Sequence, residues 1–408
     1  MSGPPAGGSP QALNADGMRR LNAGDPAGAA ALFARAAALD PAAPVLWVNL
    51  ANAERQRGDD DAEGAALARA LALDARDLAA LIRSAERFER IGQPAKAIAP
   101  WSGVLAVAPP LAECTGPLRD AVAHATGFVA ARNAAFAADI DAALGPALAA
   151  VPVADRRRID AALHAATGTR RIYTNECAGL HFPFLPADEF FDPAHFPWLA
   201  ALEAHTPAIR AEALALLGRG QDGGIKPYVA IEPGAPPNKW TPLDNSLDWG
   251  AYHLWKDGAE IPEAIARCPA TAAVLRDVPQ ADLPGRAPTA FFSILAPHTR
   301  IPPHTGVSNT RTIVHLPLIV PLGCGFRVGG ETREWVEGRA LAFDDTIEHE
   351  AWNDSDRTRI VLILDVWNPY LTAAERSLLR DFYRAADASG HNPENETPAP
   401  NQSPNING

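Results

Sequence analysis

The chain has 408 residues, of which 47% are apolar and 21% are charged, and its formal net charge is -12. This is ordinary globular composition, and at about 150 residues per domain the length predicts two or three domains. The negative charge argues against binding to the phosphate backbone of nucleic acids. The four cysteines are widely scattered, which indicates free thiols in a reducing compartment rather than a disulfide framework.

The chain start lacks a charged stretch followed by an apolar segment, and no apolar run reaches the roughly 18 residues that cross a bilayer. We therefore expect a soluble, cytoplasmic protein that does not bind a membrane. Residues 1–12 are rich in Gly, Pro and Ser, and residues 389–408 in Asn and Pro. Both ends are predicted to be disordered because they have little to bury.

A repeat dominates the first quarter of the chain. Gly24, Gly58 and Gly92 are spaced 34 residues apart, in register with Phe33, Leu67 and Trp101. This period and pattern resemble the tetratricopeptide repeat, in which each unit is a helical hairpin and the glycine ends the first helix. We assign residues 13–110 to such repeats, whose stacked helices could bind a protein or peptide partner. A generic alanine-rich helical bundle is the alternative.

Residues 111–170 stay alanine-rich and are predicted to form a helical connector, with helices near 118–137 and 158–166. Aromatic residues and prolines increase after about Arg170, and one helix is expected over 197–217. Short apolar runs then predict strands at 250–255, 290–295, 312–320, 326–328, 332–336, 339–343 and 359–367. Thr372 and Glu375 form a capping box that starts a last helix, to about Ala386. Many short strands indicate a sandwich or barrel over 171–388, so the fold class is α+β with separate domains.

Three histidines, His304, His315 and His349, lie within 46 residues of this expected sheet domain. His304 follows Pro302-Pro303 at an expected strand edge, and His349 follows Phe343-Asp344-Asp345 at the end of another expected strand. Arg359 opens a long apolar strand. Imidazole suits iron(II), and an open site with few protein ligands leaves room for a bidentate 2-oxo acid and dioxygen. Arginine pairs with carboxylate, as the far end of such a cosubstrate requires. Gly306 stands where an acidic ligand is usual, two residues after His304. Either no metal binds here, or two histidines and water hold it.

The order and spacing of these residues resemble the aspartyl/asparaginyl β-hydroxylase family. The strong match covers about 289–372, and a weaker one, including Asp248-Trp249, Leu254-Trp255 and Cys268, reaches back to about 248. The matching positions include Phe292-Ser293-Ile294, Pro303-His304-Thr305-Gly306, Asn309, Arg311, His315-Leu316, Gly330-Glu331-Thr332, Trp335, Phe343-Asp344-Asp345, Glu348-His349-Glu350, Arg359 and Asp365-Val366-Trp367.

The resemblance implies a double-stranded β-helix (jelly-roll, cupin-like) dioxygenase that uses iron(II), 2-oxoglutarate and O2. Its expected reaction is hydroxylation of a C–H bond at the β-carbon of an aspartyl- or asparaginyl-type group, in an amino acid, peptide or protein. Tetratricopeptide repeats ahead of the oxygenase domain also occur in this family, and its members use glycine in place of the acidic ligand, so Gly306 supports the assignment.

The resemblance also implies a role for each matching residue. His304 and His349 correspond to the metal ligands, and Asp345 to an acid that could hold the water replacing the missing ligand. Arg359 and Ser293 correspond to partners of the distal carboxylate of 2-oxoglutarate, and His315 to a residue near its metal-side carboxylate. Arg311 corresponds to an arginine used for an acidic substrate side chain. Trp249, in the weaker part of the match, is predicted as a substrate contact, with core packing as its alternative.

One position departs from the family pattern. The animal enzymes carry a further arginine two residues before the histidine that matches His315, and here Ile313 takes that place. The substrate therefore stays open. Two other functions also stay open: halogenation, because a glycine beside the histidine ligand can make room for chloride, and a non-catalytic interaction scaffold built on the repeats.

Overall fold

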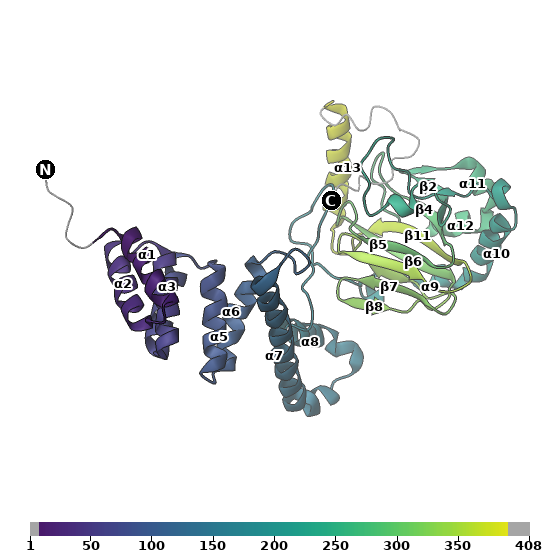
Figure 1. Cartoon of the computed structure of the whole chain (residues 1–408). Helices are drawn as coiled ribbons and strands as arrows, with labels where there is room; N and C mark the ends of the chain where they lie inside the picture. The colour runs from purple at the N-terminus through teal and green to yellow at the C-terminus, as the bar shows by residue number, and fades with distance from the viewer. Residues whose placement is uncertain (1–7, 391–408) are drawn as a thin grey trace. The chain divides into compact units, whose positions relative to one another are not determined.

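The computed structural model describes residues 8–390, and the chain divides into two compact units after Arg170. The first unit begins with six helices that form three successive hairpins (Figure 1). They are α1 (Pro10–Asn22), α2 (Pro26–Leu39), α3 (Pro44–Arg57), α4 (Asp60–Leu73), α5 (Leu78–Arg90) and α6 (Pro94–Val107). The predicted 34-residue helical repeat is confirmed.

The repeat glycines end the first helix of each hairpin, as predicted. Gly24, Gly58 and Gly92 have φ angles of 77°, 78° and 71°, in the left-handed region where a Cβ atom is unfavourable. Ala29 and Ala97 are fully buried, so the paired helices approach closely there.

The prediction that residues 1–12 are disordered is wrong for residues 10–12, which belong to α1. The Ser9 side chain accepts a hydrogen bond from the Ala12 backbone N–H at 3.2 Å, and Pro10 takes the first helical turn, where its missing N–H costs nothing. The rest of that prediction falls on residues 1–7, and most of the predicted C-terminal disorder on 391–408, outside the described residues.

Two further helices complete the first unit, and both are longer than predicted. They are α7 (Gly116–Ala149) and α8 (Val153–Ala166). Near the start of α7, Val122 and Ala125 pack in one cluster with Trp101 and Val104 of α6, which closes the open end of the repeats. Within residues 8–390, no helix combines the length and the apolar character that a membrane crossing requires.

The second unit is built on two antiparallel sheets. The larger has the order β1-β2-β4-β11-β6-β9, with β3 beside β2, and the smaller has the order β5-β10-β7-β8. Between β4 and β11 the chain passes repeatedly from one sheet to the other, and only β7 and β8 follow each other within the same sheet. The strands are β1 (Lys226–Pro227), β2 (Trp249–Lys256), β3 (Ala259–Glu260), β4 (Ala290–Leu295), β5 (Thr299–His304), β6 (Arg311–Ile319), β7 (Cys324–Val328), β8 (Glu331–Arg333), β9 (Leu341–Phe343), β10 (His349–Asn353) and β11 (Arg359–Trp367).

The single helix predicted over 197–217 is in fact two, α9 (Leu199–Ala204) and α10 (Thr206–Leu217). Pro207 lies in the first turn of α10, and because proline lacks the N–H that a continuing helix needs, α9 stops and a new helix begins. The last helix, α13 (Ala373–Ala388), begins at the predicted capping box, in which Thr372 and Glu375 bond reciprocally.

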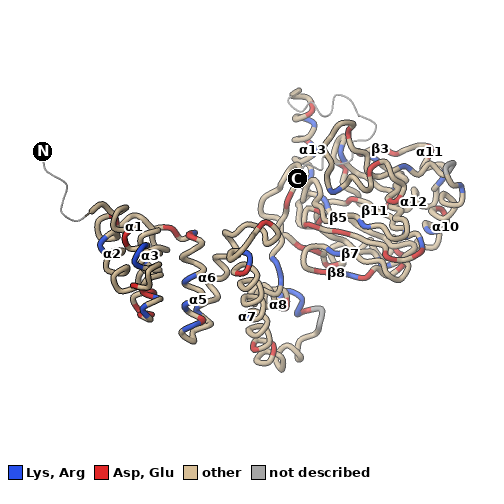
Figure 2. Tube along the Cα trace, in the orientation of Figure 1, with Lys and Arg blue, Asp and Glu red and all other residues tan. Residues whose placement is uncertain are grey.

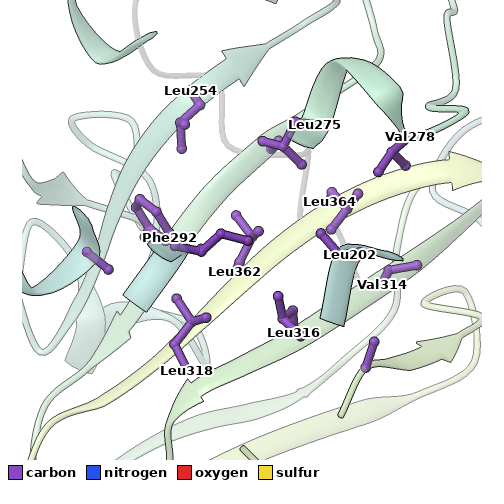
Figure 3. Packing of buried hydrophobic residues seen from close by; sticks show 14 of the residues in the cluster. Leu202, Leu254, Leu275, Val278, Phe292, Val314, Leu316, Leu318, Leu362 and Leu364 are labelled. Carbon is purple, nitrogen blue, oxygen red and sulfur yellow. The ribbon is translucent and has the colours of Figure 1, made fainter. Parts of the chain in front are cut away.

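Helices cover one face of the larger sheet. Residues of α9, α10, α11 (Pro262–Arg267) and α12 (Pro269–Asp277) pack on the outward side chains of β2, β4, β6 and β11 (Figure 3). The labelled residues in that view include Leu202, Leu275, Phe292, Leu316 and Leu362. Because side chains alternate along a strand, the remaining positions point to the inner face, toward the smaller sheet. Basic and acidic residues are interspersed along both units (Figure 2).

Candidate active site

A cavity of about 970 Å³ is lined by residues of both sheets. Its size is at the upper end of what small-molecule sites occupy. The inner face of the larger sheet supplies one part of its wall, β5, β7 and β10 of the smaller sheet supply the part that faces it, and loops with residues of α11 and α13 complete it. The structure brings all eight predicted site residues to this wall: His304, His349, Asp345, Arg359, Ser293, His315, Arg311 and Trp249.

His304 and His349 lie side by side because their strands pair. The two residues are directly opposite in the β5–β10 ladder, and their ring centroids are 4.0 Å apart. His304 Nδ1 lies 2.8 Å from the Pro302 carbonyl oxygen, and His349 Nδ1 lies 3.0 Å from that of Ile347. A carbonyl only accepts, so both Nδ1 atoms carry the proton and both Nε2 atoms keep a lone pair.

Burial also fixes the charge of these rings. It lowers the pKa of His349 to about 4 and that of His304 well below its ordinary value, where the neighbouring His349 lowers it further. Both imidazoles are therefore neutral near pH 7, which is the form that binds metal ions. In the described part of the chain, no three His, Cys, Asp or Glu side chains form a possible metal-binding group. Two histidines are thus the protein ligands that this site can offer.

Asp345 fills the space beside Gly306. A Cβ atom added to Gly306 would lie 2.1 Å from Asp345 Oδ2, and the Gly306 backbone N–H donates to the Asp345 carbonyl oxygen at 2.6 Å. Asp345 Oδ1 is buried and has no hydrogen-bond partner, and burial raises the pKa of this carboxyl to about 7. The Asp345 carboxyl, one oxygen of which has no hydrogen-bond partner, therefore lies where the Cβ atom of an acidic ligand at position 306 would be.

Arg359 is a buried cation that faces the cavity without an acidic partner among the described residues. Its side chain is 1% exposed, and burial lowers the pKa of the guanidinium to about 10. One nitrogen donates to Ser293 Oγ at 3.0 Å, the guanidinium lies over the Trp335 ring at 4.9 Å, and Nε has no partner. Because an uncompensated buried charge is costly, this arrangement favours an anionic ligand.

Ser293 is oriented by two donors. Its Oγ accepts from Arg359 and also from Trp249 Nε1, at 3.1 Å. A hydroxyl has two acceptor lone pairs and one hydrogen, so with both lone pairs occupied its O–H is left to donate into the cavity. Trp249, predicted as a substrate contact, is 5% exposed and stacks on Tyr228 at 3.9 Å. Its clearest interaction is with Ser293.

His315 lies in an aromatic pocket on the same inner face. Its ring centroid is 4.9 Å from that of Phe326 and 4.8 Å from that of Phe343. Burial, and then the charge of Arg359, lower its pKa well below the ordinary value, so the ring is neutral. Its buried Nδ1 has no hydrogen-bond partner and is available to a ligand.

Arg311 reaches the cavity but is already paired. Its guanidinium forms an ion pair with Asp365 at 2.5 Å, and the other Asp365 oxygen accepts from the Thr289 backbone N–H at 2.6 Å. Burial lowers the pKa of Arg311, but Asp365 and Asp345 outweigh burial and leave it raised. Ile313 also lines the cavity, opposite Asp365 in the β6–β11 ladder. The positive charge that the sequence predicts for Arg311 is therefore largely neutralised by Asp365.

Sequence reasoning missed three lining or neighbouring groups. Trp240 packs edge-on against His304 with centroids 5.1 Å apart, Tyr228 stacks on Trp249, and His253 stacks on Phe291 at 4.9 Å. Trp240 and Tyr228 come from a proline-rich segment without periodicity, so only their isolated aromatic character could have indicated a role. His253 is four residues after Trp249 in β2, and the alternation of side chains along a strand could have indicated that both lie on one face.

The chain is similar to proteins of one family. A sequence profile described as "Aspartyl/Asparaginyl beta-hydroxylase" matches residues 203–369. The human aspartyl/asparaginyl beta-hydroxylase is 34% identical over 184 residues, which cover 44% of this chain and 22% of that protein. The ornithine lipid ester-linked acyl 2-hydroxylase of Rhizobium tropici is 34% identical over 202 residues, 49% of this chain and 67% of that protein. The chain thus spans about a fifth of the human relative.

A solved structure resembles the helical part of the chain. The Yersinia enterocolitica type III secretion chaperone SycD is 13% identical and covers 30% of this chain and 89% of its own, with a TM-score of 0.27.

Proposed function

Because this chain belongs to the aspartyl/asparaginyl β-hydroxylase family, we propose that it is an iron(II)- and 2-oxoglutarate-dependent dioxygenase that hydroxylates a C–H bond. The observation that carries the proposal is one cavity that holds two neutral histidines with free Nε2 atoms and a buried Arg359 without an acidic partner in the described chain. A metal ion suits the first feature, and a dicarboxylate suits the second.

The side chains present fit both groups. His304 and His349 would hold iron(II), leaving the remaining positions to the cosubstrate and O2, and Asp345 would accept a hydrogen bond from metal-bound water through its unpartnered Oδ1. Arg359 and the O–H of Ser293 would bind the distal carboxylate of 2-oxoglutarate, and His315 would approach the other. The metal and cosubstrate together supply the oxidising power for C–H hydroxylation.

The protein contributes orientation and a dry environment. The Nδ1 hydrogen bonds keep the two imidazoles in one tautomer and one orientation, so no proton has to leave before the metal binds. Trp249 and Arg359 aim the Ser293 hydroxyl, and the aromatic pocket around His315 keeps water from the carboxylate pairs, which strengthens them.

The environment of Gly306 argues against halogenation. A halide would need the volume that an acidic ligand vacates, and the Asp345 carboxyl fills that volume. The scaffold alternative is disfavoured because a protein that had lost catalysis would gain nothing from keeping the buried Arg359 without a counter-ion. A protein partner bound by the helical repeats is compatible with catalysis in the second unit.

We propose the β-carbon of an aspartyl- or asparaginyl-type group as the site of hydroxylation. The human relative, whose printed name states that class, supports this choice, while the Rhizobium relative's name specifies an acyl group. The charged side chains among the residues that line the cavity favour the more polar substrate.

The test measures both turnover of 2-oxoglutarate and its binding with iron(II). Full-length protein with iron(II) and 2-oxoglutarate should produce succinate under air, and without oxygen the mixture should develop a visible charge-transfer band. His304→Ala should remove both signals, while His164→Ala, a histidine of α8 in the other unit, should retain them. Absence of the band and of succinate in the unmodified protein would overturn the proposal.

A further inference from the structure

Three basic side chains lie together at the β1–β2 side of the cavity, away from the proposed metal site. They are Lys226 of β1 and His253 and Lys256 of β2, and all three line the cavity. Lys226 is opposite Ala251 in the β1–β2 ladder, so it shares the inner face with Trp249, Ala251 and His253. A register shift after His253 turns Lys256 to the cavity while Trp255 packs in the outer core.

This basic group is separated from the metal site by a measurable length of strand. Trp249 marks the metal end of β2, because Trp240 packs on both Trp249 and His304, with centroids 6.0 and 5.1 Å away. His253 is four residues further along, about 13 Å at about 3.3 Å per residue. A substrate that reaches both places has to be extended, and an extended peptide covers that distance in about four residues.

The lysines are not neutralised by ion pairs. Neither Lys226 nor Lys256 forms a salt bridge with another residue of the described chain, and neither ring nitrogen of His253 bonds to a described residue. The same end of the cavity carries Asp257, Glu263 and Arg267, while Arg286 is held by Asp387 at 2.6 Å. The two lysine ammonium groups, which form no salt bridge with the described residues, are therefore available to an anionic ligand beside the imidazole.

We propose that Lys226, His253 and Lys256 form a docking subsite for an acidic side chain of a peptide substrate, about four residues from the residue that reacts. The inference rests on the proposed function, because that function defines where the substrate reacts. The lysines attract the carboxylate, and the neutral imidazole donates one hydrogen bond to it. Docking at this second point explains a cavity far larger than 2-oxoglutarate and a single amino acid need.

A peptide fits this part of the wall better than an acyl chain. An acyl chain lying across it would remove water from Asp257, Glu263, Arg267 and the two lysines without replacing their hydrogen bonds, which is costly. A peptide supplies amide donors and acceptors along its length. Stacking of His253 on Phe291 keeps the imidazole in place for the carboxylate.

The test uses fluorescein-labelled octapeptides of glycine and serine. Each carries one aspartate and a glutamate three, four or five residues away on either side, and each has a twin with glutamine in place of the glutamate. Fluorescence anisotropy with the full chain should show that one placement of the glutamate tightens binding about tenfold over its twin, as expected for a partly desolvated charge pair. Lys226→Gln/Lys256→Gln should abolish that preference, and Lys96→Gln, a lysine of α6, should retain it.

Two results would overturn the subsite. One is that no placement of glutamate improves binding over its twin by more than twofold. The other is lysine-dependent binding to phosphatidylglycerol vesicles without any peptide preference, which would identify a lipid phosphate as the anion. Calorimetric titration of 2-oxoglutarate tests the proposed function separately: if 2-oxoglutarate fails to bind while the lysine-dependent glutamate preference persists, the subsite stands and the hydroxylase proposal fails.

Discussion

Gly306 and Asp345 share one volume, although they are far apart in the chain. A side chain on residue 306 would begin 2.1 Å from Asp345 Oδ2, so glycine is what allows the Asp345 carboxyl to lie at this position, two residues after His304. The acid is thus retained near the proposed metal site but supplied from the segment that leads into β10. This relationship gives a physical reason why a histidine pair without an acidic ligand still has a carboxylate next to it.

Gly306→Ala should therefore damage metal binding more than it damages folding. The new methyl group has to displace the Asp345 carboxyl, and loss of such an outer partner of a metal site typically costs 10- to 100-fold in affinity. Iron(II) titration checks this, with thermal unfolding as the second measurement. Gly127→Ala, in α7 with open space around the added methyl, is the control and should bind metal normally. Equal metal affinities in the two variants would refute the role of the shared volume.

Replacing Arg359 should have opposite effects on the stability of the protein and on its binding of 2-oxoglutarate. Arg359→Met removes a buried charge that has no acidic partner among the described residues, so the ligand-free protein should become more stable, by about 1–3 kcal/mol. The same variant should lose detectable 2-oxoglutarate binding, because the distal carboxylate loses its counter-ion. Denaturant unfolding with and without 2-oxoglutarate measures both. If the ligand-free variant is instead destabilised, the contacts of Arg359 with Ser293 and Trp335 stabilise the fold more than the buried charge destabilises it, and the prediction fails.

Trp249→Phe should weaken the binding of 2-oxoglutarate, although residue 249 acts on the cosubstrate only through Ser293. The change keeps most of the stacking on Tyr228 but removes the N–H that occupies one lone pair of Ser293. The Ser293 hydroxyl can then rotate, and the KM for 2-oxoglutarate should rise about fivefold, the effect of a hydrogen bond worth about 1 kcal/mol. Trp255→Phe, on the outer side of the same strand, is the matched control and should lower stability with an unchanged KM.

Much of the sheet domain follows from local sequence. The predicted ranges 290–295 and 359–367 coincide with β4 and β11, because both are continuous apolar runs in the middle of a sheet. No range was predicted for strand β5, since Pro302 and Pro303 remove two backbone donors, and this strand lies at the edge of its sheet, where prolines are tolerated. Strand β10 was missed because its outward residues, Glu350 and Trp352, give no apolar run.

The site is predictable only in part, because some of its contacts join residues that are far apart in the chain. Family resemblance supplied the residue types, and the structure brings them to one cavity. The pairing of Arg311 with Asp365 and the filling of the Gly306 space by Asp345 depend on contacts across 54 and 39 positions of the chain, which local patterns do not encode. The same holds for Lys226 and His253, which β1–β2 pairing brings to one face.

His253 should make the stability of the second unit depend on pH. Burial, and then Lys256 and Lys226, lower the pKa of this imidazole from 6.5 to about 4. As pH falls, the unfolded chain takes up the proton first, so the stabilisation is fully present above about pH 6.5 and is lost as pH falls toward 4. Between pH 7 and pH 4.5 the wild type should lose about 2 kcal/mol more unfolding free energy than His253→Asn. Urea unfolding of both proteins at the two pH values measures this difference, and parallel losses would show that the ring is already protonated in the folded protein or that solvent screens it.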